Sequence, residues 1–378
     1  MAVVVAGYAD LSVKSSDVRR RMIDQLAAVI RGRLQAAQIT AEVSAGFDRL
    51  LISTSDPEAV SAVAVTTPGI AHVLEAAAVP AELDAICGAA TDLAAGHQAT
   101  DSFAVVVHRG QVPADVPGSQ QLKEAVGAAV QSSTTAPVDL DAPDRRYHID
   151  LRAESAYVGT DRQQGTGGLP PGVQEPVVGL MSGGIDSPVA MWQMLRRGVP
   201  VLPVHCRLGP EDEPEATMRA AACVERLNDR VGPEARPMRT VDLAPVVSLL
   251  RAETSEMRML HLHRCLLRAA ATLVEETGAA GIVTGEVIGQ KASQTSRNLG
   301  VIDAAIETAV FRPLAGMDKA QIIEEARMLG TYAPAIGPTG CDRVAPKHPE
   351  TAATPEAVVA DEPAGLAELL QRCLDGIT

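Results

Sequence analysis

The sequence feature that most constrains the fold is a regular alternation of apolar runs and helical segments that begins at residue 176. Runs of strand length lie at 176–181, 199–206, 236–243, 280–286 and 310–314, and helical segments lie at 187–198, 215–232, 260–277 and 318–330. Apolar strands separated by helices are typical of a doubly wound parallel sheet, so we expect an α/β domain here. Ligands bind such sheets outside the carboxyl ends of the strands.

The first of these strands leads into the turn Ser182–Ser187, which contains two glycines, two serines and an aspartate. Glycine lets the backbone approach a ligand closely, and the N–H groups at the start of the following helix suit a phosphate. The spacing matches neither a Walker A loop nor the G-x-G-x-x-G pattern. An aspartate beside a phosphate needs a compensating cation, and Mg²⁺ bound to pyrophosphate would provide one. The alternative is that Ser182 and Asp186 only cap the helix.

The first 160 residues follow a different pattern. Strand-like runs at 2–8, 41–54, 69–79, 102–110 and 147–159 alternate with helical segments at 18–35, 57–65, 81–94 and 119–130. This order is typical of small α+β sandwiches with antiparallel sheets. A turn-rich segment at 159–175 then separates this part of the chain from the α/β domain.

The composition is that of a folded protein outside the membrane. Of the 378 residues 46% are apolar but only 2% aromatic, and no apolar run is long enough to cross a bilayer. The first residues lack the basic region of a signal peptide. The six cysteines include no C-x-x-C pair, which argues against a zinc ribbon and against a disulfide framework. We therefore expect a cytoplasmic protein that binds no membrane and has no dedicated metal site.

Several stretches of the chain resemble one family. The segment SGGIDS at 182–187 resembles the PP-loop of the ATP pyrophosphatases, which cleave ATP between its α and β phosphates and adenylate a substrate. Within that superfamily the chain resembles the tRNA 4-thiouridine synthetases, or tRNA uracil 4-sulfurtransferases. The likeness also covers the segments 9–26, 67–79, 167–198, 283–303 and 311–331.

The resemblance implies a domain organisation and an activity. A ferredoxin-like domain (1–55) and a THUMP RNA-binding domain (56–160) would precede a linker (161–175), a PP-loop domain of the adenine nucleotide alpha hydrolase-like fold (176–350) and a C-terminal tail (351–378) with at most one short helix. The implied activity is ATP-dependent conversion of uridine 8 in tRNA to 4-thiouridine through an adenylated uracil, with release of AMP and pyrophosphate. Relatives also supply sulfur for the thiazole ring of thiamine.

The resemblance also implies cofactors and site residues. ATP and Mg²⁺ are the implied cofactors. Lys319 matches the family's catalytic lysine, Asp186 its PP-loop aspartate and Cys341 its cysteine in the PP-loop domain. Positions that match ATP contacts are Leu180, Met181, Ser182, Gly183, Gly184, Asp186, Ser187, His205, Cys206, His263, Gly285 and Gln294. His263 departs from the family, which usually has lysine or arginine there, and this puts that nucleotide contact in doubt.

The source of sulfur is a further departure. Some relatives carry a C-terminal rhodanese-like domain whose cysteine bears a persulfide, and we expect this protein to be without that domain. Sulfur would then come from a separate persulfide carrier protein, from free sulfide, or from a persulfide on Cys341. Cys341 has polar, loop-like neighbours, although it could instead pack as a small apolar residue. Cys206, Cys223 and Cys265 lie in apolar patterns, so we expect core packing for them. The lack of a C-x-x-C pair argues against an iron–sulfur cluster, although three distant cysteines could still converge.

The net charge of −14 would ordinarily count against a nucleic-acid partner, although acidic excess also suits proteins that work at high salt. The helix at 18–35 nevertheless contains five arginines, which a solvated helix face would explain equally well. With few aromatic residues, tRNA recognition would depend on contacts of basic residues with phosphates. The candidates are Lys14, Arg19, Arg20, Arg21, His108, Arg109 and Lys123. Dimerisation through the N-terminal half is common in the family.

Two alternative functions remain at this point. A PP-loop enzyme could adenylate another acceptor, but a small-molecule ligase would have little use for a THUMP-like half. The chain could also be a non-catalytic tRNA-binding protein with a decayed ATP site. The intact turn at 182–187 and the presence of Lys319 argue against such decay.

Overall fold

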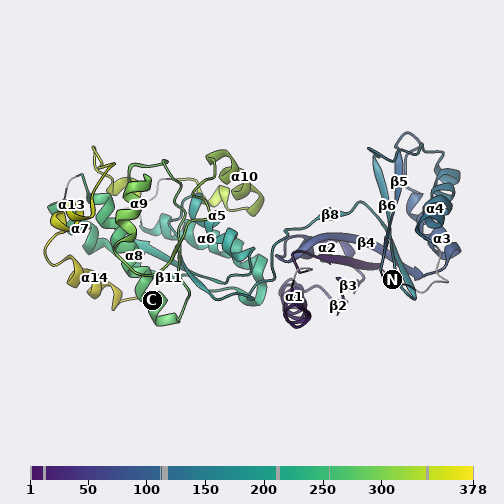
Figure 1. The fold of residues 1–378 in the computed structure, drawn as a ribbon, viewed down its shortest axis with the longest axis horizontal. Helices are drawn as coiled ribbons and strands as arrows, with labels where there is room; N and C mark the ends of the chain where they lie inside the picture. Colours follow the sequence, from purple (N-terminus) through teal and green to yellow (C-terminus); the bar gives the residue numbers. More distant parts are fainter. Residues whose placement is uncertain are drawn as a thin grey trace. The chain divides into compact units, whose positions relative to one another are not determined.

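The computed structural model describes residues 2–11, 14–110, 112, 118–209, 213–254, 256–337 and 340–377. The chain divides into two compact units, residues 1–170 and 171–378 (Figure 1). In the described ranges, no helix is both long and apolar enough to cross a membrane.

The N-terminal unit is built on one sheet of eight strands. These are β1 (Ala2–Tyr8), β2 (Ala41–Ala45), β3 (Arg49–Thr54), β4 (Ile70–Pro80), β5 (Phe103–Arg109), β6 (Arg145–Leu151), β7 (Ser155–Thr160) and β8 (Gln163–Gln164). The strand order is β2-β3-β1-β4-β7-β6-β5, with β8 paired to β4. Neighbours are antiparallel except β5 and β6, which are parallel, so the prediction of purely antiparallel sheets is wrong at this pair. A helix between β5 and β6 provides the crossover that parallel pairing requires.

The four helices of this unit form two separate cores on that sheet. The helices are α1 (Ser16–Ala36), α2 (Pro57–Val65), α3 (Leu83–Ala94) and α4 (Ser119–Thr134). The first core contains Leu26, Ile30 and Leu50, and the second contains Phe103 and Tyr147. The long strand β4 contributes Val73 to the first core, and its other end packs Ala77 against the second. The segments predicted as ferredoxin-like and THUMP domains therefore contribute strands to a single sheet.

The C-terminal unit contains a five-stranded parallel sheet. The strands are β9 (Val177–Leu180), β10 (Val201–Arg207), β11 (Arg239–Asp242), β12 (Ile282–Val283) and β13 (Val310–Phe311), in the order β11-β10-β9-β12-β13. The chain adds β10 and β11 on one side of β9 and then returns to add β12 and β13 on the other side. This is the doubly wound arrangement that the sequence predicted, and its order reverses between β9 and β12.

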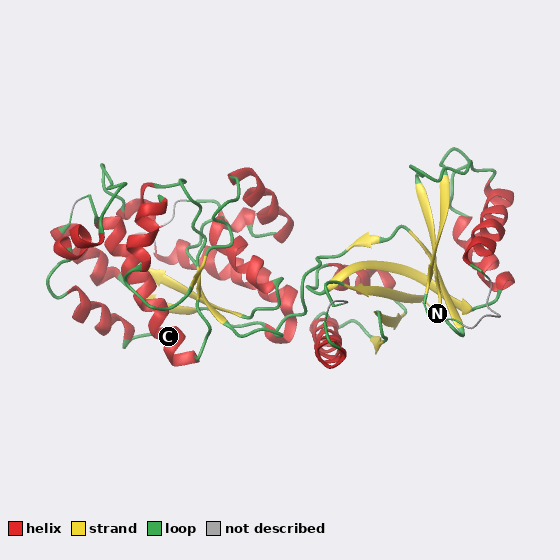
Figure 2. Ribbon diagram, viewed as in Figure 1, coloured by secondary structure: helices red, strands yellow, loops and turns green. Residues whose placement is uncertain are grey.

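Helices cover both faces of this sheet (Figure 2). They are α5 (Asp186–Leu195), α6 (Glu213–Val231), α7 (Ala244–Glu253), α8 (Arg258–Thr277), α9 (Ser296–Asp303), α10 (Lys319–Leu329), α11 (Tyr332–Ala335), α12 (Gly340–Val344), α13 (Pro355–Asp361) and α14 (Leu366–Leu374). Val177 packs in the core with α5, α6 and α10, whereas Val178 packs in the core with α7, α8 and α14. Consecutive residues of β9 are therefore buried on opposite faces, as expected for a sheet covered on both sides.

The residues after 350 are a folded part of this unit. Helices α13 and α14 pack with α8, and their buried side chains include Val358, Leu366, Leu370 and Leu374. Arg268 of α8 also forms two hydrogen bonds of 3.1 Å with Glu362. The prediction of at most one short helix in this segment is wrong, because leucines four residues apart at 366, 370 and 374 give α14 an apolar side.

Candidate active site

The turn that follows β9 is organised by its two serines. Ser187 Oγ accepts a hydrogen bond from the backbone N–H of Ser182 (3.1 Å) and lies 3.1 Å from Ser182 Oγ. Ser182 Oγ also accepts a hydrogen bond from the N–H of Gly184 (3.3 Å). Gly183 has a φ of +76°, and a Cβ there would lie 2.8 Å from the carbonyl oxygen of Ala216. The turn therefore requires glycine at position 183.

Helix α5 starts at the end of this turn without a side-chain cap. Its N-cap residue is Ile185, and no hydrogen bond from a described side chain caps the helix. The alternative that Ser182 and Asp186 serve only as helix caps is therefore wrong. Uncapped N–H groups and the positive end of the helix dipole make this position suitable for a phosphate group.

A cavity of about 500 Å³ lies in front of the turn. We call it the Asp186 cavity, and its lining includes Ser182, Gly184, Asp186, Ser187, His263, Gly285, Glu286, Gln290, Lys291, Gln294, Lys319, Tyr332 and Cys341. It includes residues that directly follow β9 and β12, between which the strand order reverses. Ligands of doubly wound sheets bind at such a switch point.

The Asp186 carboxylate binds side chains from two other segments. Lys319 Nζ lies 2.5 Å from Oδ1, and Gln290 Nε2 donates to Oδ2 at 2.9 Å. Lys319 is the first residue of α10, where Asp318 and Gln321 form a capping box. The Lys319 side chain remains 45% exposed, so its ammonium group is accessible to a ligand in the cavity.

Gly285 allows the segment after β12 to approach the start of α5. A Cβ at this position would lie 2.8 Å from the backbone nitrogen of Ser187 and 2.9 Å from its Cα. Gln294, in a short 3₁₀ turn, is buried in the same cavity wall, and its Oε1 has no hydrogen-bond partner among the described residues. An unsatisfied buried carbonyl oxygen is costly unless a ligand or water donates to it.

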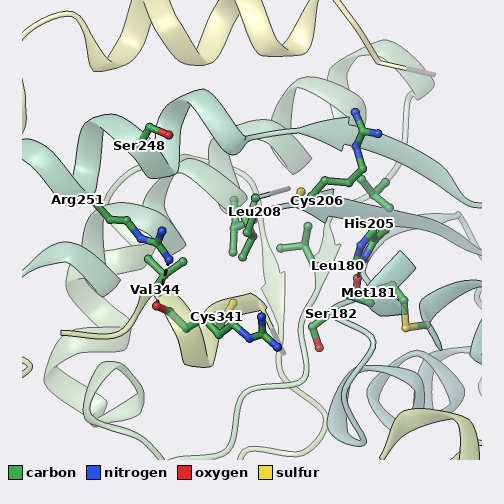
Figure 3. A pocket seen from close by; sticks show the side chains of 16 residues that line it. Leu180, Met181, Ser182, His205, Cys206, Leu208, Ser248, Arg251, Cys341 and Val344 are labelled. Carbon is green, nitrogen blue, oxygen red and sulfur yellow. Dashed lines mark hydrogen bonds between the residues drawn. The ribbon is translucent and has the colours of Figure 1, made fainter. Parts of the chain in front are cut away.

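A second cavity of about 300 Å³ adjoins the first (Figure 3). We call it the His205 cavity, and its lining includes Met181, His205, Cys206, Arg207, Leu208, Ser248, Arg251, Arg343 and Val344. The ring N–H at Nδ1 of the buried His205 donates to the carbonyl oxygen of Met181 (2.7 Å), which links the ends of β9 and β10. Leu180, Ser182, Leu266 and Cys341 line both cavities, so the two spaces meet at the turn.

Charged and polar side chains form a chain of contacts at one wall of the Asp186 cavity. Glu286 Oε1 lies 3.2 Å from His263 Nδ1, and Glu286 Oε2 accepts hydrogen bonds from Thr284 (3.0 Å) and from Arg312 Nε (2.6 Å). Arg312 in turn makes two hydrogen bonds to Asp303, of 2.9 and 2.6 Å. Burial would raise the pKa of Glu286, but its hydrogen bonds and the nearby His263 and Arg312 lower it to about 2.

The cysteines differ in their surroundings. Cys223 and Cys265 are fully buried, which confirms the prediction of core packing for these two. Cys206 is only partly buried and lines the His205 cavity, and burial, with a smaller effect of Cys341, raises the pKa of Cys206 to about 12. Cys341 lies in the short helix α12, is partly buried and reaches both cavities. No group of three His, Cys, Asp or Glu residues suited to a metal ion occurs in the described part of the chain.

The predicted RNA contacts lie in the N-terminal unit. Lys14, Arg20, Arg21, Arg109 and Lys123 are exposed, and Arg20 and Arg21 lie on α1. Arg19 is partly buried, because its guanidinium donates to the carbonyl oxygen of Phe47 (2.7 Å) and lies over the Phe47 ring. The His108 ring stacks on His148 at a centroid distance of 5.7 Å, and burial and the nearby Arg162 lower the pKa of His108.

Sequence reasoning missed four residues of the Asp186 cavity and its wall: Glu286, Gln290, Lys291 and Arg312. The first three lie inside the segment 283–303 and Arg312 lies inside the segment 311–331, both of which had already been singled out. Their polar character between apolar neighbours was the available signal. Arg312 was not identifiable, because its partners Glu286 and Asp303 are 26 and 9 residues away in the sequence.

Comparisons with known families match both units of the chain. The family model of the thiamine biosynthesis protein ThiI matches residues 172–364, and the model of the THUMP domain matches residues 80–161. The two matches cover the parts of the sequence that hold the cavities and the second core of the N-terminal sheet, respectively.

Individual proteins are similar over much longer stretches. A probable tRNA sulfurtransferase of Halobacterium salinarum is 38% identical over 371 residues, which is 97% of this chain and 94% of that protein. A probable tRNA sulfurtransferase of Thermus thermophilus is 36% identical over 301 residues, or 78% of this chain and 73% of that protein. Among solved structures, a 4-thiouridine synthetase in complex with RNA and ATP is 26% identical with a TM-score of 0.87, and the match covers 100% of this chain and 98% of that one.

Proposed function

From the premise that the chain belongs to the ThiI family of tRNA sulfurtransferases, we propose that it uses ATP to convert uridine 8 of tRNA to 4-thiouridine. The observation that carries this proposal is the meeting of two cavities at the uncapped start of α5, with Asp186 and Lys319 on one side of it. Such a site offers one space for adenosine, a phosphate-binding turn, and a second, larger space for the remaining phosphates and the acceptor.

ATP would occupy both cavities. The backbone of His205 and Cys206 would flank the adenine in the His205 cavity, and the N–H groups of the turn would hold the α-phosphate. The β and γ phosphates would extend into the Asp186 cavity, where Lys291 and Lys319 provide positive charge. The unsatisfied Oε1 of Gln294 supports a ligand in the Asp186 cavity that donates a hydrogen bond.

The reaction follows from the weakness of the uracil oxygen as a leaving group. Attack of O4 on the α-phosphate forms an adenylated base and releases pyrophosphate. Negative charge then grows on the phosphoryl oxygens, where the Lys319 ammonium and the N–H groups of α5 would stabilise it. A hydrosulfide ion would next attack C4 and displace AMP, which gives 4-thiouridine directly. A Cys341 persulfide would displace AMP to form a Cys341–S–S–C4 bond, and a second thiol would then release 4-thiouridine by forming a disulfide with Cys341.

We propose that ATP binds together with Mg²⁺. Two carboxylates line the Asp186 cavity, and Glu286 is held by His263, Thr284 and Arg312, which leaves the partly exposed Asp186 as the carboxylate for an ion. That donor set fits Mg²⁺, which is commonly held by one or two carboxylates together with substrate phosphates and water. Asp186 would hold the ion, which would neutralise charge on the departing pyrophosphate when bound.

The remaining elements of the proposal concern sulfur and location. We propose that Cys341 handles sulfur because it is the partly exposed cysteine that reaches both cavities. A persulfide carrier protein would transfer its outer sulfur atom to Cys341, whereas free sulfide would attack the adenylated uracil directly and would not need Cys341. The same chemistry would allow a role in thiamine thiazole synthesis. The tRNA substrate implies activity in the cytoplasm, and a homodimer is proposed on the family likeness alone.

The test is to incubate the purified protein with unmodified tRNA, α-labelled ATP, Mg²⁺ and either sulfide or a persulfide. AMP release and the near-ultraviolet absorbance of thiouridine are followed at low and high salt. We expect both products only when tRNA is present. Cys341→Ala should release AMP normally but form no thiouridine from the persulfide, whereas the matched control Cys373→Ala on α14 should behave as the wild type.

Two results would contradict the proposal. Release of AMP that does not depend on tRNA would favour a different acceptor. Binding of tRNA without any release of AMP would favour a non-catalytic RNA-binding protein.

A further inference from the structure

His263 and Cys341 meet at the junction of the two cavities. His263 projects from α8 and lines the Asp186 cavity, and Cys341 comes from α12 and lines both cavities. Both side chains line the Asp186 cavity where α12 contacts α8, and Cys341 raises the pKa of His263. A histidine beside a partly exposed cysteine is the arrangement that activates a thiol for nucleophilic attack.

A third residue fixes the orientation of the imidazole ring. Glu286 Oε1 lies 3.2 Å from Nδ1 of His263, which leaves Nε2 as the ring nitrogen available to the thiol. Glu286 is itself held by Thr284 and by Arg312. The side chains of His263 and Glu286 are only 13% and 11% exposed, so the ring has little freedom to turn away. Nucleophile, acid–base group and orienting carboxylate thus line one cavity together.

The charges of this array are defined by its contacts. Burial alone would lower the pKa of His263, but its hydrogen bonds to Cys341 and Glu286 outweigh burial and raise the pKa to about 9. The imidazole therefore carries a proton at neutral pH while Glu286 is ionised.

We propose that His263 is the acid–base partner of Cys341, and that the pair accepts a sulfur atom from a persulfide donor. This inference rests on the proposed function, in which Cys341 handles sulfur. The Cys341 thiolate attacks the terminal sulfur of the donor persulfide and forms a new S–S bond. The S–S bond within the donor breaks, and the departing donor thiolate takes the proton from Nε2 of His263. The products are a Cys341 persulfide and the donor thiol, with no net oxidation or reduction.

The pair also gives a reason for histidine at this position of the sequence. A lysine or arginine would keep its proton near neutral pH and would act only as a fixed positive charge. The pKa of His263, about 9, lies below that of a lysine or arginine, so a histidine gives its proton to a departing thiolate more readily. The family usually has lysine or arginine at position 263. Here a histidine replaces it, and the carboxylate of Glu286 orients the ring of that histidine.

The first test measures the reactivity of Cys341 without ATP or tRNA. Wild type and His263→Gln are treated with iodoacetamide between pH 6 and 9, and alkylation of the peptide that contains Cys341 is followed by mass spectrometry. We expect at least an approximately tenfold slower reaction at pH 7 for His263→Gln. The matched control is His261→Gln, which changes a histidine of the same helix that contacts Asp361 and lines neither cavity. It should react like the wild type.

The second test measures sulfur transfer itself. Each variant is incubated with glutathione persulfide, and the added sulfur atom on the Cys341 peptide is quantified. Wild type should accept sulfur, His263→Gln should be severely slowed, and His263→Lys should show normal alkylation but slow sulfur transfer. Full transfer by His263→Lys would show that positive charge is sufficient and would overturn the acid–base role.

The outcomes separate this inference from the proposed function. Wild-type reactivity of Cys341 in His263→Gln, with or without a defect in AMP release, would overturn the inference and leave tRNA thiolation intact. A His263-dependent Cys341 in a protein that forms no thiouridine would support the pair while contradicting the proposed function.

Discussion

Asp186 and Lys319 are 133 residues apart in the sequence, yet their side chains form an ion pair with an N–O distance of 2.5 Å beside the Asp186 cavity. The pair joins the first turn of α5 to the first turn of α10. Partly exposed ion pairs contribute only about 0–1 kcal/mol to stability. The contact is therefore better suited to position two reactive groups than to stabilise the fold, and a phosphate could displace it at little cost.

Replacement of Lys319 by alanine should abolish adenylation while leaving the fold intact. Loss of a group that stabilises developing charge typically lowers the rate by about 100-fold or more, so we expect AMP release to fall by that amount with little change in the melting temperature. The matched control is Glu324→Ala, an exposed residue on the same helix. Nearly normal AMP release by Lys319→Ala would contradict a catalytic role for this lysine.

Gly285 should not tolerate a side chain. In Gly285→Ala the new Cβ would lie 2.8 Å from the backbone nitrogen of Ser187, so β12 and α5 would have to separate. Overpacking of this kind costs about 1–3 kcal/mol, and the displaced turn should bind ATP weakly. Chemical denaturation and ATP titration provide the measurements.

The control for this substitution is Gly300→Ala. Gly300 lies in α9, where an added Cβ meets no atom within 4 Å. Alanine is favoured over glycine within a helix by about 0.5–1 kcal/mol, so this variant should be slightly more stable and fully active. If Gly285→Ala were equally stable and bound ATP normally, the close approach of the two segments would not be essential.

The stability of the C-terminal unit should depend on pH through His263 and Glu286. The pKa of His263 is raised to about 9 in the folded state, from an ordinary value of 6.5. The contribution of His263 to the free energy of unfolding is therefore fully present below pH 6.5 and is lost as the pH rises through 9. The charged or titratable groups in contact with it are Glu286 and Cys341. Wild type should lose more unfolding free energy between pH 6 and 9.5 than His263→Gln does.

The pKa of Glu286 is shifted in the opposite direction, so its effect on stability falls in a different pH range. Its pKa is lowered to about 2 from an ordinary 4.5, so its stabilising contribution is present above pH 4.5 and is lost as the pH falls through 2. Urea denaturation of both proteins at pH 6 and 9.5 isolates the effect of His263, because Glu286 stays ionised throughout. Equal losses in the two proteins would indicate that His263 does not hold its proton more tightly in the folded state.

The sequence predicted the parts of this molecule that depend on local pattern. Apolar runs separated by helices were sufficient to place the parallel sheet and the turn after its first strand, because burial on both faces and a helix start leave local signatures. The contacts of Glu286 with His263 and with Arg312 leave no such local signature in the sequence. Glu286 is 23 positions from His263 and 26 positions from Arg312. Likewise α13 and α14 are stabilised by packing on α8, which no short segment reveals on its own.

The last prediction concerns RNA binding by an acidic protein. Arg20 and Arg21 are exposed on α1, whereas Arg19 is engaged with Phe47. Each phosphate contact contributes about 0.9 to the slope of log K against log salt for duplex nucleic acid. We therefore expect the double variant Arg20→Ala, Arg21→Ala to bind tRNA more weakly and to lower that slope by about 1–2. The measurement is a tRNA titration at several salt concentrations, with Arg327→Ala on α10 as the control. An unchanged slope would show that these two arginines are a solvated helix face, and that the phosphate contacts lie elsewhere on the unit.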